Sequence, residues 1–516
     1  MVNLIRLVYG RARMEQLISA AARKDIMSSI RRAFFFASAE RYVVILISFA
    51  QVPIIARLMG PAEFGISVLG MAALAIAEVI RDFGGGAYII QEKQLTIERV
   101  RTAFTITLAW TLILTVALLL AAEPLARFYE IPGLKLYLQI VAISYLAGPF
   151  VAPLFALMQR DMAFDKIAIV TIITTTTNAA LSITFASLGY SYLSFALANV
   201  VSACCGMVLG FYFRPQFSVF RLSLAEWRRL INFGQYQMGV GMLACLWNYV
   251  PYLIIGRMLD NTAIGLYQRA ATVSTLPLKA VSAIDYVAFP AISAHLRDGG
   301  EIKHAYLRAV VFVTGVHWPG LIVLALLAHP LVAILLGHHW QAAAPLVFIM
   351  ALARLFGFAG SLTNSSLLAA GHPRQLFLLH LIVVPVALSA TALSAPYGIN
   401  AVAWAMCLTA PFEFAVALYF MRQFATFSIS ELLAALRPSA VVTLLCALGP
   451  LLIVATRRWG EHLPFGTLMA ALALALVGWT VGLWLTKHPL LEELRRAGSA
   501  GLSAFRAVAV RQRQIS

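Results

Sequence analysis

Charged residues are scarce in this sequence. Only 12% of its 516 residues are Asp, Glu, Lys or Arg, whereas 61% are hydrophobic. Soluble globular proteins carry about 25% charged residues, and a soluble chain of this length would have several hydrated domain surfaces to cover. The composition therefore excludes a soluble enzyme, a disordered chain and a nucleic-acid-binding module. It leaves a membrane protein with many spans.

Cysteine and long hydrophilic loops are rare as well. The five cysteines all lie in apolar runs without metal-site or disulfide spacing, so we interpret them as small buried residues. No loop exceeds about twenty residues, which leaves no room for a catalytic or nucleotide-binding domain. Gly84-Gly85-Gly86 lacks the Lys-Ser/Thr that completes a phosphate-binding loop. We therefore expect no enzyme activity and no cofactor.

Long apolar runs dominate what is present. A helix needs about 20 apolar residues to cross the hydrocarbon core of a bilayer, and fourteen runs reach that size. None of them alternates as a barrel strand would. The sequence thus predicts an all-α polytopic membrane protein with about 14 transmembrane helices. The predicted spans are 34–56, 64–90, 103–122, 134–157, 167–188, 191–213, 231–255, 264–289, 306–328, 343–370, 376–395, 399–421, 439–456 and 464–486.

The basic residues orient these spans. With the N-terminus inside, and with Lys135 and Arg308 at the ends of their spans counted with the adjoining loops, 28 of the 39 Lys and Arg residues fall in cytoplasmic segments, six fall outside and five lie within spans. A missed span would destroy this asymmetry, so the positive-inside rule predicts that both termini are cytoplasmic. The N-terminal segment has no signal-peptide pattern and is typical of a basic segment lying on the inner leaflet. We expect a bacterial inner membrane protein with this orientation.

An internal repeat divides the chain. Residues 54–66 read IIARLMGPAEFGI and residues 254–266 read IIGRMLDNTAIGL, with Arg57/Arg257 and Gly65/Gly265 among the identities. Both copies follow the first helix of a six-helix block. Two six-helix lobes in pseudo-twofold repeat, followed by two extra C-terminal helices, imply alternating access between the lobes.

The predicted organisation follows from this repeat. In order, we expect a basic cytoplasmic N-terminal segment (1–33), an N-lobe of six spans (34–213), a cytoplasmic linker (214–230), a C-lobe of six spans (231–421), the last two spans (422–486) and a basic cytoplasmic tail (487–516).

Four short motifs connect the chain to a known family. They are Ala56-Arg57-Leu58-Met59-Gly60-Pro61-Ala62-Glu63-Phe64-Gly65, Asp82-Phe83-Gly84, Ile255-Gly256-Arg257-Met258-Leu259 and Gly337-His338-His339-Trp340 with Ala344-Pro345-Leu346. In this order the motifs resemble the polysaccharide transporter family, whose members flip oligosaccharide repeat units. That family belongs to the multidrug/oligosaccharidyl-lipid/polysaccharide (MOP) exporter superfamily. The resemblance covers about residues 34–422, and Asp260 departs from it where glycine is expected.

The resemblance implies a substrate and partners. It predicts a flippase that moves an undecaprenyl-pyrophosphate-linked oligosaccharide across the inner membrane for exopolysaccharide, capsule or O-antigen synthesis. Membrane lipids, a polysaccharide polymerase and export machinery are the implied partners, and no nucleic acid is. A multidrug cation antiporter of the same superfamily and a lipid II flippase stay open as alternatives. A membrane enzyme such as a polymerase would need a long outside loop, which the sequence lacks.

Charged residues inside the spans are the candidate site. Such a residue costs about 2.5–3.5 kcal/mol on insertion scales, so it indicates either a function or a paired partner. The cations that we expect to bind the diphosphate are Lys279, Arg269, Arg354 and Arg81. The acids that would couple transport or balance charge are Glu78, Asp82, Asp285 and Glu413.

Two structural alternatives remain for these charges. Glu78 and Arg81 are three residues apart and share a helix face, so they can neutralise each other. Arg354 and Glu413 can form a salt bridge within the second lobe. Lys279 has no acid three or four residues away and follows Pro277, which favours a cavity-facing position.

The remaining polar residues give weaker signals. Asn248 and Tyr252 are candidate sugar contacts. His338-His339 has no third ligand nearby, so we expect no metal site. Trp340 and Trp459 are typical of anchors at the membrane interface.

Overall fold

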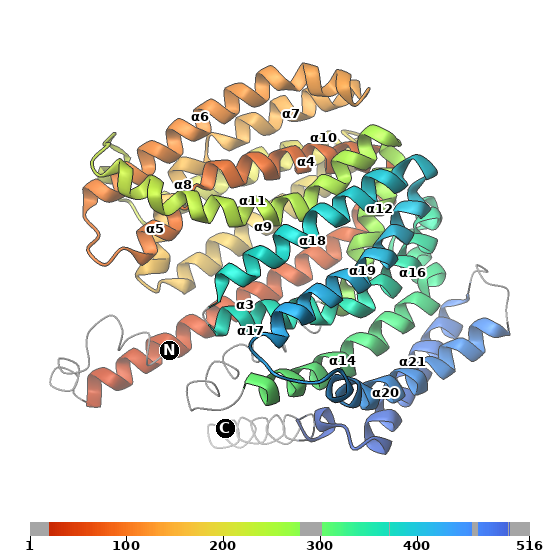
Figure 1. Ribbon diagram of the computed structural model, residues 1–516. Helices are drawn as coiled ribbons and strands as arrows, with labels where there is room; N and C mark the ends of the chain where they lie inside the picture. Colours follow the sequence, from red (N-terminus) through yellow and green to blue (C-terminus); the bar gives the residue numbers. More distant parts are fainter. Residues whose placement is uncertain (1–19, 279–301, 371, 457–462, 494, 496–516) are drawn as a thin grey trace, which may run out of the picture. The chain divides into compact units, whose positions relative to one another are not determined.

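The computed structural model describes residues 20–278, 302–370, 372–456, 463–493 and 495 (Figure 1). Every regular element in these ranges is a helix, which confirms the predicted all-α class. The chain separates into two compact units, Met1–Gly265 and Leu266–Ser516, with the boundary inside α12.

The first unit is built around long helices that are joined by short turns. The described elements are α3 (Ala20–Leu58), α4 (Pro61–Asp82), α5 (Gly85–Gln91), α6 (Ile97–Phe128), α7 (Pro132–Tyr145), α8 (Gly148–Arg160), α9 (Phe164–Ser187), α10 (Leu193–Phe213), the 3-10 turn η1 (Phe217–Phe220), α11 (Trp227–Met258) and the start of α12 (Asn261–Ser274). Within the unit α6 runs beside α7, α3 beside α9 and α11 beside α4. The predicted fourth span is the pair α7 and α8, which meet at an angle of 46°.

The second unit continues α12 and adds the remaining described helices. Its elements are α14 (Ile302–Leu326), α15 (Ala328–Leu335), η2 (His338–Ala343), α16 (Ala344–Ala353), η3 (Arg354–Phe356), α17 (Gly357–Ala369), α18 (Pro373–Ser394), η4 (Ala395–Tyr397), α19 (Ile399–Arg422), α20 (Ile429–Ala455) and α21 (Phe465–Leu485). Within this unit α14 and α21 pack against α20, while α16, α17 and α18 pack against α19.

Local sequence explains where these helices begin. Thr96 precedes α6, and its hydroxyl accepts the backbone N–H of Arg99. Ser428 precedes α20 and forms a reciprocal capping box with Glu431. Each cap satisfies backbone donors that the first helical turn leaves without a partner. Pro61, at the first position of α4, lacks the N–H that would otherwise need a cap.

The described helices account for twelve of the fourteen predicted spans. Eleven are long and apolar enough to cross a membrane, and the bent α7–α8 pair is the twelfth. Predicted spans 231–255 and 264–289 correspond to α11 and to α12, which are not in that set. The second half of span 264–289 lies outside the described residues, so the exact number of fourteen stays a prediction.

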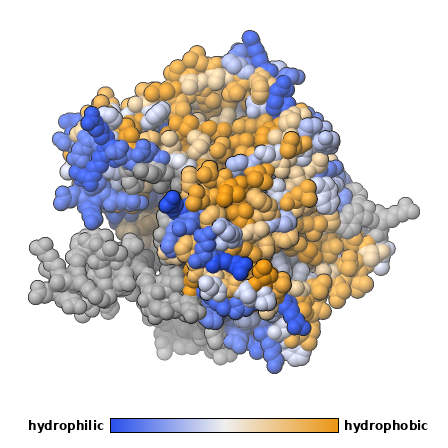
Figure 2. Space-filling view, viewed as in Figure 1, coloured by the Kyte–Doolittle hydropathy of each residue, from blue (hydrophilic) through white to orange (hydrophobic). Residues whose placement is uncertain are grey.

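The outer surface of these helices is apolar, as a lipid-facing surface is. Leu120 on α6, Leu408 on α19 and Leu444 on α20 are 73%, 79% and 68% exposed. Hydrophobic side chains cover much of the face seen in Figure 2. A water-soluble protein would bury such residues, so this surface supports a multi-pass membrane protein.

The five cysteines are free, and Cys204 is exposed among them. The prediction that all five are buried was therefore wrong.

The two copies of the sequence repeat meet symmetrically inside the first unit. A Cβ atom at Gly65 would overlap the carbonyl oxygen of Asn261, and one at Gly265 would overlap that of Pro61. Gly265 lies 200 residues after Gly65, and Asn261 lies 200 residues after Pro61. Each contact therefore becomes the other when the two copies of the repeat are exchanged, as a pseudo-twofold relation requires. Only glycine lets the backbones approach so closely, which explains why the repeat keeps it at both places.

Candidate functional site: intramembrane charges

Glu78 and Arg81 form an ion pair within α4. The Arg81 Nη2 atom lies 3.1 Å from the Glu78 Oε1 atom. The Glu78 side chain is 58% exposed, whereas that of Arg81 is only 17% exposed. The pairing that their three-residue spacing predicted is therefore present, and the Arg81 guanidinium is the more enclosed partner.

The Arg81 guanidinium sits at the bend between α7 and α8. Its Cζ atom lies 4.7 Å from the centre of the Tyr145 ring, the last residue of α7. The Tyr145 hydroxyl donates a hydrogen bond of 2.9 Å to the backbone oxygen of Leu74. Gly148, at the start of α8, leaves the space that one guanidinium nitrogen occupies. Arg81 thus has an acid on its own helix and an aromatic face on the neighbouring one.

The other predicted site residues of the first unit are Asp82 on α4 and Asn248 and Tyr252 on α11. Asp82 is exposed at the end of α4. The Asn248 amide donates to the backbone oxygen of Ala244 in its own helix, at 2.7 Å. Tyr252 is half-buried. The α11 residues on which the Glu78 charge acts are instead Cys245 and Tyr249.

Arg354 occupies a break in the tenth predicted span. The α16 helix ends at Ala353, a 3-10 turn covers Arg354–Phe356, and α17 begins at Gly357. Such a turn inside a helix often marks a functional position. The Arg354 Nε donates a hydrogen bond of 3.0 Å to the Ser274 hydroxyl, which is completely buried at the end of α12.

Three titratable side chains on other helices lie within electrostatic range of Arg354. The arginine charge acts on Tyr267 of α12, His317 of α14 and Glu413 of α19. A carboxylate oxygen of Glu413 lies 3.1 Å from where a Cβ at Gly360 would stand, so this glycine of α17 makes room for it. The structure therefore gathers Arg354, Glu413 and Ser274 in one place.

Arg269 lies in a packed position within the second unit. It is 5% exposed, and its Cζ atom lies 5.7 Å from the centre of the Trp340 ring. Trp340 is completely buried, so the expectation that it is an interface anchor was wrong. Its indole instead packs in the interior beneath an arginine. Lys279, Asp285 and Trp459 fall outside the described residues.

Several residues of these sites escaped the sequence analysis. Ser274, His317, Tyr145 and Tyr249 are single polar or aromatic residues in apolar helices. No local pattern separates them from ordinary packing residues. Among the residues that the structure describes, no three His, Cys, Asp or Glu side chains are grouped closely enough to hold a metal ion.

Comparison with known proteins decides the family. The profile of the polysaccharide biosynthesis protein family matches residues 54–345, more than half of the chain. The chain belongs to the polysaccharide biosynthesis protein family. The match includes the repeat at Gly65 and Gly265 and the loop at Gly337, so it confirms the resemblance that these motifs indicated.

Three known bacterial proteins are similar to this chain over about two thirds or more of their length. The succinoglycan biosynthesis transport protein ExoT of Rhizobium meliloti is 27% identical over 463 residues, covering 87% of this chain and 91% of that protein. The teichuronic acid biosynthesis protein TuaB of Bacillus subtilis is 22% identical, covering 67% and 72%. The lipopolysaccharide biosynthesis protein WzxC of Escherichia coli is 22% identical, covering 63% and 67%.

Solved structures place this family member in a wider fold group. The lipid II flippase MurJ in an inward closed conformation matches with a TM-score of 0.73 and 14% identity, covering 89% of this chain and all of MurJ. An inward-facing multidrug resistance MATE transporter of the MOP superfamily matches with a TM-score of 0.59 and 12% identity, covering 76% and 98%. At these identities the likeness shows the fold alone, and that fold is the one predicted for the chain.

Proposed function

We propose that this protein is a flippase that moves an undecaprenyl-pyrophosphate-linked oligosaccharide repeat unit across the bacterial inner membrane. The observation that carries the proposal is the similarity to ExoT, a succinoglycan biosynthesis transport protein, over 87% of this chain and 91% of ExoT. TuaB and WzxC are named for teichuronic acid and lipopolysaccharide biosynthesis. All three names concern surface polysaccharides, although the polymers differ.

The geometry fits a diphosphate head group better than a cationic cargo. Arg81 and Arg354 each present a guanidinium within a span, and planar guanidinium groups match phosphate oxygens in a bidentate manner. A multidrug cation antiporter would need an acidic or aromatic site instead. The lipid tail of the substrate would remain in the bilayer beside the apolar helix surface.

Alternating access is the proposed mechanism. Two six-helix repeats related by a pseudo-twofold axis would rock around a substrate near the middle of the membrane. We expect the driving force to come from the membrane potential or an ion gradient, with Glu78, Asp82, Asp285 and Glu413 as the acids that carry or balance charge. Both termini would be cytoplasmic, since 28 basic residues then lie inside.

The partners follow from this role. A polysaccharide polymerase and export machinery would take over the repeat unit on the outer face, and the chain itself would perform no covalent chemistry. Lys279, Arg269, Arg354 and Arg81 remain the proposed cations for the diphosphate, and Asn248 and Tyr252 the proposed sugar contacts.

Deleting the gene and analysing the lipid-linked intermediates tests the proposal. We expect undecaprenyl-diphosphate oligosaccharide to accumulate on the cytoplasmic face while surface polysaccharide is lost. Normal polysaccharide with increased drug sensitivity would instead indicate the multidrug antiporter. Accumulation of lipid II, with cell lysis, would indicate the lipid II flippase.

A further inference from the structure

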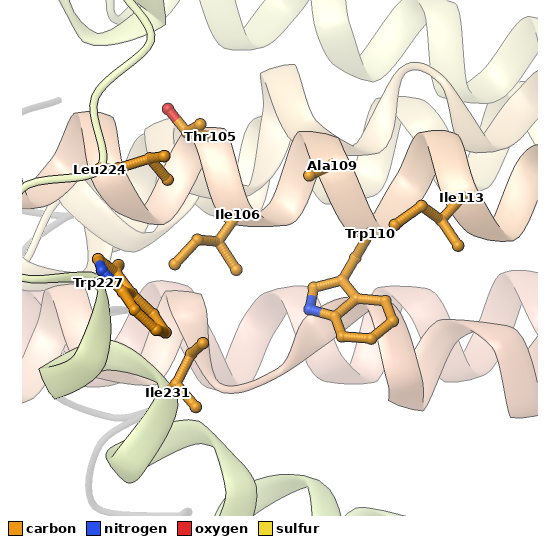
Figure 3. A pocket seen from close by; sticks show the side chains of 8 residues that line it. All are labelled: Thr105, Ile106, Ala109, Trp110, Ile113, Leu224, Trp227 and Ile231. Carbon is orange, nitrogen blue, oxygen red and sulfur yellow. The ribbon is translucent and has the colours of Figure 1, made fainter.

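An apolar pocket lies where the segment after α10 meets α6. Its volume is about 290 Å³, and five of its eight lining residues lie along one face of α6. The others come from the end of the linker and the first turns of α11. The lining residues are Thr105, Ile106, Ala109, Trp110, Ile113, Leu224, Trp227 and Ile231 (Figure 3).

Hydrogen bonds fix one wall of this pocket. The Thr102 hydroxyl donates to the backbone oxygen of Ala225 at 2.7 Å, and the backbone N–H of Ser223 donates to the Thr105 hydroxyl at 2.9 Å. Arg101 donates to the backbone oxygen of Ser218 at 2.9 Å. The linker is therefore fastened along the start of α6, and the pocket beside it is formed before any ligand arrives.

The ion pairs beside the pocket are already satisfied. Glu226 has a φ of 59°, an uncommon value for a residue other than glycine, and both its carboxylate oxygens accept from Arg99. Arg229 forms ion pairs with Glu226 and Glu92, and Arg99 forms a further ion pair with Glu92. Two arginines and two glutamates thus form a closed neutral network that holds the linker in place.

Arg228 stands outside this network, at the rim of the pocket. Its side chain is exposed, and its Cζ atom lies 5.5 Å from the centre of the Trp227 ring, which lines the pocket. Within the described part of the chain, no carboxylate lies within ion-pair distance of Arg228. The pocket therefore combines an apolar interior, an indole at its opening and a cation above the indole.

This combination matches the chemistry of a phospholipid. Tryptophan is enriched where the bilayer meets water, and basic residues at the cytoplasmic ends of spans attract anionic head groups. We propose that the pocket binds one anionic phospholipid of the cytoplasmic leaflet, with an acyl chain against Ile106 and Trp110 and the phosphate beside Arg228. A cavity of this volume takes part of one acyl chain.

Native mass spectrometry of the purified protein tests this site. The probes are phosphatidylglycerol and phosphatidylcholine with the same acyl chains. We expect wild type to retain one phosphatidylglycerol, and Ala109→Trp, which fills the pocket from an exposed helix position, to retain about tenfold less. Ala117→Trp adds the same side chain at another exposed alanine of α6, outside the pocket, and should bind as wild type does.

A second pair of variants tests the head-group contact. Arg228→Gln should lower the preference for phosphatidylglycerol over phosphatidylcholine by about fivefold, the effect of one basic residue at a lipid surface. Arg308→Gln is the matched control, because Arg308 is also exposed and lies over an aromatic ring, that of Phe312, at 5.7 Å.

Three outcomes would overturn the proposal. Equal phosphatidylglycerol retention by Ala109→Trp and wild type would show that the pocket is not the site. Unchanged lipid preference in Arg228→Gln would remove the head-group contact. Displacement of phosphatidylglycerol by an equal concentration of undecaprenyl phosphate would assign the pocket to the polyprenyl chain instead. Because binding is measured without transport, none of these outcomes depends on the proposed flippase activity.

Discussion

The intramembrane charges of the two units are held in different ways. Glu78 and Arg81 neutralise each other from one helix, and the Glu78 side chain stays 58% exposed. Arg354 is anchored by Ser274 of α12 and acts on Glu413 of α19, so its environment comes from separate helices. An ion pair within one helix stays neutralised when neighbouring helices move. Charges that are compensated by side chains of other helices lose this compensation when those helices move.

This difference assigns different roles to the two arginines. Over the described ranges, Glu78 is the only acid that pairs with Arg81, and its side chain is 58% exposed, so a diphosphate can compete with it for Arg81 without moving another helix. The Arg354 contacts change whenever α12 and α19 shift relative to η3, and a shared group of this kind can couple substrate binding to movement. We therefore expect the Arg354 site to be the more sensitive of the two.

Replacing Arg354 should have the largest effect. Arg354→Gln removes the charge and leaves Glu413 without that compensating cation, so transport should fall by about tenfold or more, as when one partner of a buried charge pair is truncated. Arg354→Lys keeps the charge but loses the planar donor geometry, and it should recover only part of the activity. Surface polysaccharide from a complemented deletion strain, normalised to membrane protein level, gives the measurement. Wild-type export by Arg354→Gln would contradict a role for this site.

Replacing Arg81 should have a smaller effect. Arg81→Gln removes one cation and its contact with Tyr145 but leaves a partner, Glu78, whose side chain is 58% exposed and not buried, so we expect a loss of about threefold in the same assay. Glu78→Gln should lose less than about twofold, because Arg81, the proposed diphosphate ligand, keeps its charge and its contact with Tyr145. If Arg81→Gln were more damaging than Arg354→Gln, the ranking of the two units would be reversed.

Two glycines allow the same comparison without removing any charge. A Cβ at Gly360 would stand 3.1 Å from the Glu413 carboxylate, and one at Gly148 would overlap the Arg81 guanidinium. Gly360→Ala should lower transport by about twofold, since the carboxylate must shift within a packed site. Gly148→Ala should cost less, because the flexible end of Arg81 can move aside. Gly357→Ala is the control, as its Cβ would meet nothing within 4 Å, and a loss there equal to that of Gly360→Ala would rule out the steric explanation.

How much of this could be predicted from the sequence depends on distance along the chain. Apolar runs fixed the all-α class and most of the spans, because crossing a bilayer requires length and apolarity alone. The Glu78–Arg81 pair was predictable since three residues place both on one helix face. The contact between Arg354 and Ser274 joins residues 80 positions apart. Nothing local indicates it, because it depends on how α12 packs against the break in the tenth span.

The smallest effect is expected at Asn248, and it sharpens the comparison within the first unit. Its amide already donates to the backbone oxygen of Ala244, whereas the Glu78 charge acts on Tyr249, the next residue of α11. Asn248→Ala should therefore change transport by less than about twofold, because the lost bond lies within an intact helix and is worth about 1 kcal/mol at most. Tyr249→Phe keeps the ring and removes the hydroxyl on which the Glu78 charge acts, so it should be the more sensitive of the two substitutions. Export assays at matched protein level compare them. A larger loss in Asn248→Ala than in Tyr249→Phe would restore Asn248 as a sugar contact and move the functional face of α11 by one residue.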